Sequence, residues 1–377
     1  MRHVMVCAAA LGLGLAGMAA AQESVLWLHP MCEQLDIPYN GPFEQLSDGT
    51  LLVIDRNVLR KSADGGKTWE AVSGEIAPGL DINYGGHPGQ FIQTRNGTIV
   101  VVYLDMANYV FSWNDEKSEP NPECRLELWA IRSTDGGKTW SDRQQLLPGY
   151  NADFMGLIQL DSGRLVATVE HLDPKLCRWV VLSFVSDDEG KTWQHGNIID
   201  LGGRGHHDGA VEPCVAPLGD GRLLMFIRTG LGQFWYAYSE DGGRYWRTIR
   251  PSGIDASSAP GWVERLASGR LVFVWNRSKP EGAEKPTSFW HGQAHEVPAP
   301  GHREELSIAF SDDDGQSWTD PVVLMREPNG QLAYPYVLER APGELWVTTR
   351  YTFLTGGKPA PPVKVRLFEK DFVKTGE

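Results

Sequence analysis

The sequence is poor in cysteine, in basic residues and in long apolar runs. Five of its 377 residues are cysteine, and 35 Lys and Arg stand against 48 Asp and Glu, which gives a formal net charge of −13. Nucleic acids and anionic membranes attract proteins with an excess of Lys and Arg, so we expect neither as a partner. Beyond the N-terminal segment no apolar run reaches the roughly 18 residues of a membrane-spanning helix, so no membrane span is expected.

The N-terminal segment has the pattern of a secretory signal. Arg2 and His3 precede an apolar run from Val4 to Met18, and three alanines at 19–21 form a small-residue cleavage site. We therefore expect a signal peptide over residues 1–21 and a secreted or periplasmic protein. The remainder, residues 22–377, is expected to form a single domain.

The cysteines that remain after such cleavage give no metal-binding pattern. No CxxC pair is present, so no zinc site is indicated, and we expect no metal and no cofactor. In an oxidising compartment four cysteines allow three disulfide pairings, and their spacing does not choose between these. Cys214 lies in an apolar run, where we expect a buried free thiol. The other three are Cys32, Cys124 and Cys177.

A repeated octad, Ser-x-Asp-x-Gly-x-x-Trp, is the main feature that the sequence does have. Its Asp can accept backbone N–H bonds, its Gly permits positive φ, and its Trp can pack under a hairpin. Each octad therefore predicts a tight structural turn and not a metal or catalytic site. The five copies are Ser62 to Trp69, Ser133 to Trp140, Ser186 to Trp193, Ser239 to Trp246 and Ser311 to Trp318.

A second repeat, a turn glycine followed by a β-rich run such as TLLVID or RLLMFI, occurs six times. Six such units predict an all-β fold, a six-bladed β-propeller of four-stranded antiparallel blades. The last unit, from Gln331 to Val373, lacks an octad. The spare run from Ser24 to Pro30 is expected to complete the last blade. The turn glycines are Gly49, Gly97, Gly163, Gly221, Gly269 and Gly343.

Aligning the six units on these glycines brings ionisable residues to the rim opposite the octads. Nine residues before each glycine stand Asn40, Pro88, Phe154, Glu212, Pro260 and Tyr334, and seven residues after it stand Arg56, Leu104, Glu170, Arg228, Asn276 and Arg350. Arginines gathered on one rim of an acidic protein favour an anionic ligand, most simply a carboxylate held bidentately. The alternative is that these arginines only pair with acids of neighbouring blades.

With these motifs the mature chain resembles the sialidase (neuraminidase) superfamily over essentially its whole length. The octads are similar to that family's Asp boxes, which specify a fold better than an activity. Glu212, in AVEPCVAPLGDGRLLMFIR, is similar to the Glu that activates the family's nucleophile, and Tyr334, in QLAYPYVLERAPGEL, resembles that nucleophile. Arg228 and Arg303 match two members of the carboxylate-binding arginine triad, and Arg56 matches a further arginine of the family.

The resemblance implies an exported exo-glycosidase that acts with retention on a terminal acidic sugar of a glycan, a sialic acid or a related ulosonic or uronic acid. The anomeric carbon of a sialic acid bears a carboxylate, which would repel an anionic nucleophile. A neutral Tyr that an adjacent Glu deprotonates avoids this repulsion, and Tyr nucleophiles are an exception among retaining glycosidases.

The first blade departs from the family pattern in two places. The usual Arg-Ile-Pro is replaced by Asn40-Gly41-Pro42, so one triad arginine is missing. The loop that carries the family's Asp acid/base is also missing, because only six residues separate Arg56 from Ser62. Another group on the same rim must then protonate the leaving group, and the candidates are His87, His206, His207, Asp208 and Asp81. His206, His207 and Asp208 also allow a metal-ligand interpretation, which lacks a third spaced ligand.

Two insertions, Asp105 to Arg125 and Ser278 to Arg303, lie on this rim and carry Trp113 and Trp290; they are either lids that stack on sugars or ordinary packed loops. Two other functions fit the same sequence. A polysaccharide lyase would use a His and Tyr334 next to a uronate carboxylate. A non-enzymatic glycan-binding propeller would keep the arginines without an acid/base.

Overall fold

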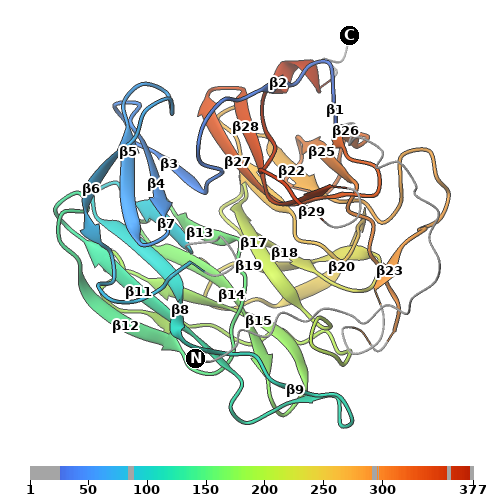
Figure 1. The fold of residues 1–377 in the computed structure, drawn as a ribbon, viewed down its shortest axis with the longest axis horizontal. Helices are drawn as coiled ribbons and strands as arrows, with labels where there is room; N and C mark the ends of the chain where they lie inside the picture. Colours follow the sequence, from blue (N-terminus) through green and yellow to red (C-terminus); the bar gives the residue numbers. More distant parts are fainter. Residues whose placement is uncertain (1–25, 84–88, 291–294, 296, 355–357, 374–377) are drawn as a thin grey trace.

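Six antiparallel sheets are arranged around a common axis in the computed structural model (Figure 1), which describes residues 26–83, 89–290, 295, 297–354 and 358–373. The first strands of the six sheets contact one another in a closed cycle, from β3 through β7, β13, β17, β21 and β27 back to β3. The all-β six-bladed propeller is therefore confirmed. The expected signal peptide lies outside the described residues.

The first three blades follow one another along the chain. Blade 1 contains β3 (Phe43–Gln45), β4 (Leu51–Asp55), β5 (Val58–Ser62) and β6 (Glu70–Glu75); blade 2 contains β7 (Gln90–Gln93), β8 (Ile99–Val110), β11 (Arg125–Ser133) and β12 (Ser141–Leu147); blade 3 contains β13 (Gly156–Gln159), β14 (Leu165–Asp173), β15 (Arg178–Ser186) and β16 (Gln194–His195). The blade 2 insertion forms a hairpin of β9 (Trp113–Asn114) and β10 (Glu119–Pro120).

The last three blades continue the same order; blade 5 takes a fifth strand from the N-terminal segment, and blade 6 takes its fourth strand from there. Blade 4 contains β17 (Val211–Pro217), β18 (Leu223–Arg228), β19 (Gln233–Ser239) and β20 (Thr248–Asp255); blade 5 contains β21 (Trp262–Arg265), β22 (Leu271–Trp275), β25 (Glu305–Ser311), β26 (Val322–Arg326) and β1 (Trp27–Leu28); blade 6 contains β27 (Gln331–Ala341), β28 (Glu344–Leu354), β30 (Lys364–Phe368) and β2 (Glu33–Gln34). Four short elements remain: β23 (Phe289–Trp290) pairs with β24 (Ala299–Pro300), β29 (Lys358–Pro359) pairs with β28, and η1 (Glu369–Asp371) is one turn of 3-10 helix.

The ring is closed differently from the sequence-based expectation. The run from Ser24 to Pro30 does not complete the last blade: its strand β1 pairs with β26 of blade 5, and the following strand β2 pairs with β30 of blade 6. The reason is a turn, in which the Cys32 N–H donates to the His29 carbonyl at 2.8 Å and carries the chain from one blade edge to the next.

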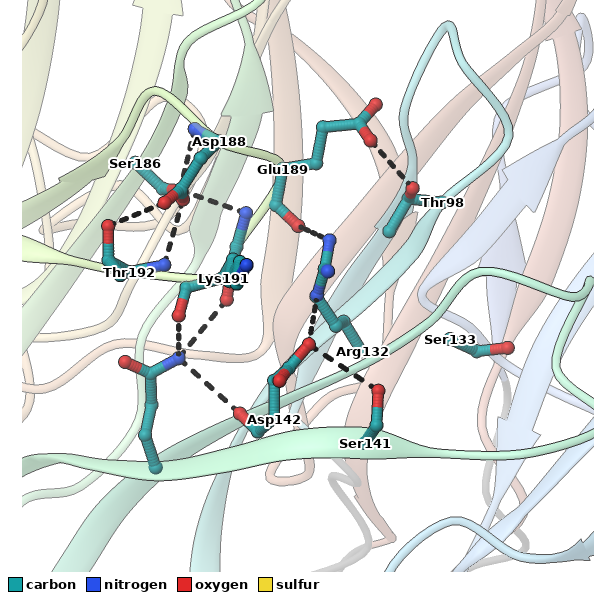
Figure 2. A network of polar contacts seen from close by, with 12 residues as sticks. Thr98, Arg132, Ser133, Ser141, Asp142, Ser186, Asp188, Glu189, Lys191 and Thr192 are labelled. Carbon is teal, nitrogen blue, oxygen red and sulfur yellow. Dashed lines mark hydrogen bonds and ion pairs between the residues drawn. The ribbon is translucent and has the colours of Figure 1, made fainter.

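Each octad forms the predicted turn. In the third one the Ser186 hydroxyl donates to Asp188 at 2.9 Å and accepts the Gly190 N–H at 2.8 Å, while the Asp188 carboxylate accepts the Thr192 N–H (Figure 2). The Ser to Asp and Gly to Ser bonds recur in the other four octads. The octads therefore stabilise the scaffold on the rim away from the ionisable residues.

The octad turns also join neighbouring blades. Figure 2 shows Glu189 of the third octad accepting a bond from the Thr98 hydroxyl of blade 2 at 2.9 Å, and its carbonyl accepting one from Arg132 at 3.4 Å. In the second octad Gly137 has φ +89°, and a Cβ there would collide with Leu59 of blade 1. Close approach between blades therefore requires glycine at this position.

The apolar core is divided among the interfaces between blades. Six clusters of buried apolar side chains are present among the described residues, and each one lies mainly between two adjacent blades, with Val211 and Tyr336 extending two of them to a third blade. The cluster between blades 6 and 1 is the smallest, with Ile37, Leu51 and Trp346 as its buried members. Neighbouring blades therefore hold one another in place, which fixes side chains that reach the axis from different blades.

Candidate active site

Tyr334 and Glu212 meet at the end of the axis that the sequence alignment indicates. The Tyr334 hydroxyl donates to Glu212 Oε1 at 2.5 Å, although the residues lie on β27 and β17 of different blades. Both side chains are buried, with 8% and 5% of the residue surface exposed. Burial, and then the charge of Glu212, raises the pKa of Tyr334 well above its ordinary value. The hydroxyl is therefore protonated at rest, and a base must remove its proton before the oxygen can attack.

Both residues have unusual backbone conformations at equivalent positions of their blades. Glu212 has φ +44° and Tyr334 has φ +59°, in the left-handed region that residues other than glycine rarely adopt. Each is followed by a proline, Pro213 or Pro335, which has no N–H to donate to a strand ladder. Glu212 also lies within a register irregularity between β17 and β18. Such conformations cost about 1–3 kcal/mol each and are frequent at functional sites.

Glu170 stabilises the unusual backbone of Glu212. Its Oε2 accepts the Glu212 N–H at 2.7 Å, and its side chain is buried. Burial, and then the nearby charge of Glu212, raises the pKa of Glu170 well above its ordinary value. Glu170 was aligned at the rim in the sequence, but its contact with Glu212 joins two blades and has no sequence signal.

Arg228 contacts the second oxygen of the same carboxylate. Its Nη1 donates to Glu212 Oε2 at 2.5 Å, and the two side chains are 4% and 6% exposed. Burial alone would lower the pKa of Arg228, but the Glu212 carboxylate outweighs it and raises the pKa. Arg228 therefore stays charged beside the Tyr334 and Glu212 pair.

Arg303 approaches the pair from blade 5. Its guanidinium carbon lies 5.8 Å from the centre of the Tyr334 ring and 5.5 Å from that of the Trp290 ring. Its Nη2 donates to the Ser258 carbonyl at 2.5 Å. Two of the predicted carboxylate-binding arginines therefore lie next to the predicted nucleophile.

A third arginine, Arg350, was not assigned to the site from the sequence. Its guanidinium carbon lies 4.5 Å from the centre of the Tyr334 ring, and both its terminal nitrogens donate to Asp153 at 2.6 Å. The sequence did contain a signal for its place on the rim, because Arg350, like Arg228, lies seven residues after a turn glycine. Nothing in the sequence pairs it with Asp153, which lies 197 positions away.

A pocket of about 220 Å³ opens beside these groups, and Asp153, Glu170, Glu212, Arg228 and Tyr334 all line it. The opposite wall is aromatic, with Tyr109, Phe111, Tyr150 and Trp179. Tyr109 and Phe111 come from the blade 2 insertion, so this insertion borders the pocket. The site thus joins a charged face to an apolar wall, a common arrangement for small-ligand sites.

His207, like its neighbour His206, is a candidate proton donor that lines this pocket. Its Nδ1 lies 2.5 Å from Nδ1 of His206, so one ring must donate its proton and the other must accept it. Desolvation by the pocket, and then the charges of His206 and Arg228, lowers the pKa of His207 well below its ordinary value, although part of the residue is exposed to solvent. His207 is therefore neutral at pH 7, so it must first take up a proton before it can act as an acid.

The other predicted site residues lie elsewhere. Arg56 has φ +56° in the turn between β4 and β5, and with Asn40 it lines a separate pocket. Asp81 is exposed and accepts the Asn83 N–H, without lining the pocket of Tyr334. Asp208 lies 3.7 Å from His295 and also outside that lining. His87 falls outside the described residues.

Among the described positions, no three His, Cys, Asp or Glu side chains are grouped as they would be around a metal ion. The cysteines at 32, 124, 177 and 214 are all free, and burial raises the pKa of the Cys214 thiol to about 12, in line with the expected buried thiol. In the part of the chain that the structure covers, no helix has both the length and the apolar character to cross a membrane.

Comparison with known proteins places the chain in a family. The sequence model of the BNR repeat-like domain family matches residues 91–347. A sialidase of Micromonospora viridifaciens is 25% identical over 291 residues, which are 73% of this chain and 42% of that protein. The chain therefore spans less than half the length of this relative.

Solved structures share the fold at lower identity. A protein of unknown function from Dyadobacter fermentans aligns with TM-score 0.59 and 18% identity, covering 90% of this chain and all of the other. A Hadza microbial sialidase aligns with TM-score 0.54 and 17% identity, covering 88% of this chain and 65% of the other. The matched family model, the sialidase relative and the six blades together show that the chain belongs to the BNR repeat-like domain family and has the propeller fold of sialidases.

Proposed function

We propose that the protein is an exported glycosidase of sialidase type, which removes a terminal acidic sugar from a glycan with retention of configuration. The observation that carries the proposal is the 2.5 Å bond between Tyr334 and Glu212 beside Arg228. The sialidase relatives support the substrate class at family level. Export rests on the signal-like pattern of residues 1–21 alone.

In the proposed first step the Tyr334 oxygen bonds to the anomeric carbon while the bond to the leaving oxygen breaks. Glu212 Oε1 accepts the phenol proton, and the leaving oxygen receives a proton from an acid in the pocket. Water then attacks the anomeric carbon while the deprotonated acid takes a proton from it, the bond to Tyr334 breaks, and Glu212 returns the phenol proton to the Tyr334 oxygen. Two displacements at the same carbon restore its configuration.

Arg228 and Arg303 are the proposed carboxylate clamp. Each hydrogen bond between a guanidinium and a carboxylate contributes about 1.5–3 kcal/mol when water is excluded. Arg350 donates to Asp153 from both its terminal nitrogens and is not part of the proposed clamp. With Asn40 in place of the usual arginine, the clamp has two members, which permits acidic sugars other than sialic acid.

His207 is the proposed proton donor to the leaving group, because it lines the pocket together with Tyr334. A single positioned acid contributes about 10²–10⁴-fold to a rate. Asp81 and Asp208 do not line the pocket, so we favour His207 over both.

One observation favours a second candidate, a uronate-directed polysaccharide lyase. A His with a lowered pKa is a better base than acid at neutral pH, and His207 faces the same pocket as Tyr334. In a lyase His207 would take the proton next to the uronate carboxylate, and Tyr334 would protonate the leaving oxygen as the double bond forms.

A product assay separates these candidates. Purified protein is incubated with sialosides and with uronate-containing oligosaccharides, and the products are followed by chromatography and ultraviolet absorbance. Release of a free acidic sugar, formed first as the retained anomer by NMR, supports the proposal. An absorbing unsaturated product supports the lyase. Tight binding of an acidic sugar with no product indicates a glycan-binding protein and contradicts both enzymes.

A further inference from the structure

Ser258, in the segment between β20 and β21, contacts both candidate carboxylate-binding arginines. Arg228 donates to its hydroxyl oxygen from Nε at 3.3 Å and from Nη2 at 3.0 Å. Arg303 donates to its carbonyl oxygen from Nη2 at 2.5 Å. Ser258 has no exposed surface, and its own N–H donates to the Pro300 carbonyl at 2.7 Å. A single fixed residue therefore links guanidinium groups that come from two blades.

The contacts of Ser258 also determine where its hydroxyl proton points. A hydroxyl has two lone pairs and one proton. Arg228 N–H groups take both lone pairs, so the proton is left for His295 Nε2, which lies 3.4 Å away. His295 is buried, and its Nδ1 faces Asp208 Oδ1 at 3.7 Å. His295 then carries its proton on Nδ1, directed toward the carboxylate.

Asp208 is itself held in place. Its carboxylate accepts the Gly209 N–H at 2.8 Å and the Arg204 N–H at 3.1 Å. Ser258, His295 and Asp208 thus form a chain in the order of a hydrolase triad. Ser258 is nevertheless not placed to attack a substrate, because it is fully buried and both lone pairs face a guanidinium. The chain instead ends on Arg228.

This anchoring leaves Arg228 suited to grip one carboxylate. Among the described residues its bonds to Ser258 and Glu212 use three of its five N–H groups. One N–H remains on each terminal nitrogen, and a bidentate carboxylate accepts one bond from each. Rotation of the guanidinium would break the Ser258 bonds, so Ser258 restricts the direction in which these donors point.

We propose that Ser258 is a positioning residue that sets the separation and orientation of Arg228 and Arg303, and that His295 and Asp208 direct its hydroxyl. The carboxylate ligand in this inference rests on the proposed function. The anchoring of the arginines does not depend on it.

The test compares Ser258→Ala with Ser257→Ala. Ser257 is the adjacent serine, is equally buried, and its hydroxyl donates to the Pro300 carbonyl at 3.2 Å without contacting either arginine in the described bonds, so it is a matched control. Crystal structures of the wild type and both variants show the arginines directly. Calorimetry with free sialic acid and glucuronic acid, and KM against kcat on the best substrate, report on the clamp.

In Ser258→Ala we expect the Arg228 guanidinium to leave its place, the affinity for the acidic sugar to fall about tenfold (about 1.4 kcal/mol), and KM to rise more than kcat falls. Ser257→Ala should leave all three unchanged. His295→Leu should weaken binding in the same direction, and His295→Gln, whose amide oxygen accepts a bond near the Nε2 position, should restore part of it. If Ser258→Ala does not fold, the two His295 variants carry the test.

An Arg228 that keeps its position in Ser258→Ala, or an affinity equal to that of the wild type, overturns the inference. Equal binding by His295→Leu and His295→Gln overturns the role of His295. If the wild type binds neither acidic sugar while Arg228 still moves in Ser258→Ala, the proposed function is wrong and the positioning role stands.

Discussion

The Tyr334 hydroxyl and the Glu212 carboxylate are joined by a 2.5 Å hydrogen bond, although 122 positions separate the two residues. The other oxygen of the same carboxylate accepts a bond from Arg228. Glu212 is thus held by a charged partner while it contacts a phenol whose pKa burial raises. In this arrangement proton transfer from Tyr334 to Glu212 needs no movement of either side chain, which is what activation of a neutral nucleophile requires.

Replacing Tyr334 by Phe removes the proposed attacking oxygen and keeps the ring that Arg303 and Arg350 contact. We expect turnover of the best substrate to fall by more than about 10³-fold, with binding of the free acidic sugar little changed. Steady-state kinetics and calorimetry measure the two effects. Tyr236→Phe is the control, because Tyr236 is also buried and its hydroxyl accepts a bond from Trp318. Full turnover by Tyr334→Phe would exclude it as the nucleophile.

Replacing His207 by Gln tests its role as the acid. We expect turnover of substrates with alkyl leaving groups to fall by about 10²–10⁴-fold, and turnover of aryl glycosides to fall much less, because a phenolate leaves without a proton. The ratio of the two kcat/KM values is the measurement. His195, which lies on blade 3 and contacts the Gly196 carbonyl, provides the control substitution His195→Gln. Equal losses on both substrates would contradict an acid role.

Replacing Asp153 by Asn tests the buried pair with Arg350. The two side chains are 7% and 1% exposed, so the variant leaves a buried guanidinium without its counter-charge. We expect the free energy of unfolding to fall by about 3–5 kcal/mol, measured by urea denaturation. The control, Asp161→Asn, removes an exposed partner of Arg95 and should change stability little. A stability equal to that of the wild type would show that Arg350 needs no counter-charge.

Glu44 and Glu264 predict a pH dependence of stability. Both are half-buried and line a second pocket between the first strands of the blades. Burial, and then the neighbouring charge of Glu264, raises the pKa of Glu44 to about 8, and burial raises that of Glu264 to about 7. The folded state therefore binds these protons more tightly than the unfolded state. Their stabilising contribution is complete below the unfolded pKa of about 4.5 and is lost as the pH rises through 7 and 8.

The double variant Glu44→Gln with Glu264→Gln mimics the protonated forms at every pH. We expect its free energy of unfolding to match the wild type near pH 4 and to exceed it at pH 8, measured by denaturation at both values. Glu116→Gln, at an exposed position, should have the same free energy of unfolding as the wild type at both pH values. A double variant less stable than the wild type at pH 8 would contradict the predicted sign.

The repeats allowed most of the fold to be predicted. Octads and turn glycines are local signals, because a hairpin turn depends on the φ angles and side-chain bonds of a few consecutive residues. They indicated six blades and the rim to which Glu212, Arg228 and Tyr334 belong. The prediction that Ser24 to Pro30 closes the ring was wrong. A strand of two residues, such as Trp27–Leu28, is too short to show an alternating apolar pattern, and its partner depends on which blade edge is free in the folded protein.

The sequence by itself determined the turns, the number of blades and the level at which each ionisable side chain reaches the axis, since these follow from strand length and turn position. The tertiary structure alone decided which side chains meet across blades: Glu170 with the Glu212 backbone, Asp153 with Arg350, and Ser258 with two arginines. Such contacts depend on the separation of blades that six apolar interfaces set jointly. No local pattern encodes that separation, because it arises only when the ring closes.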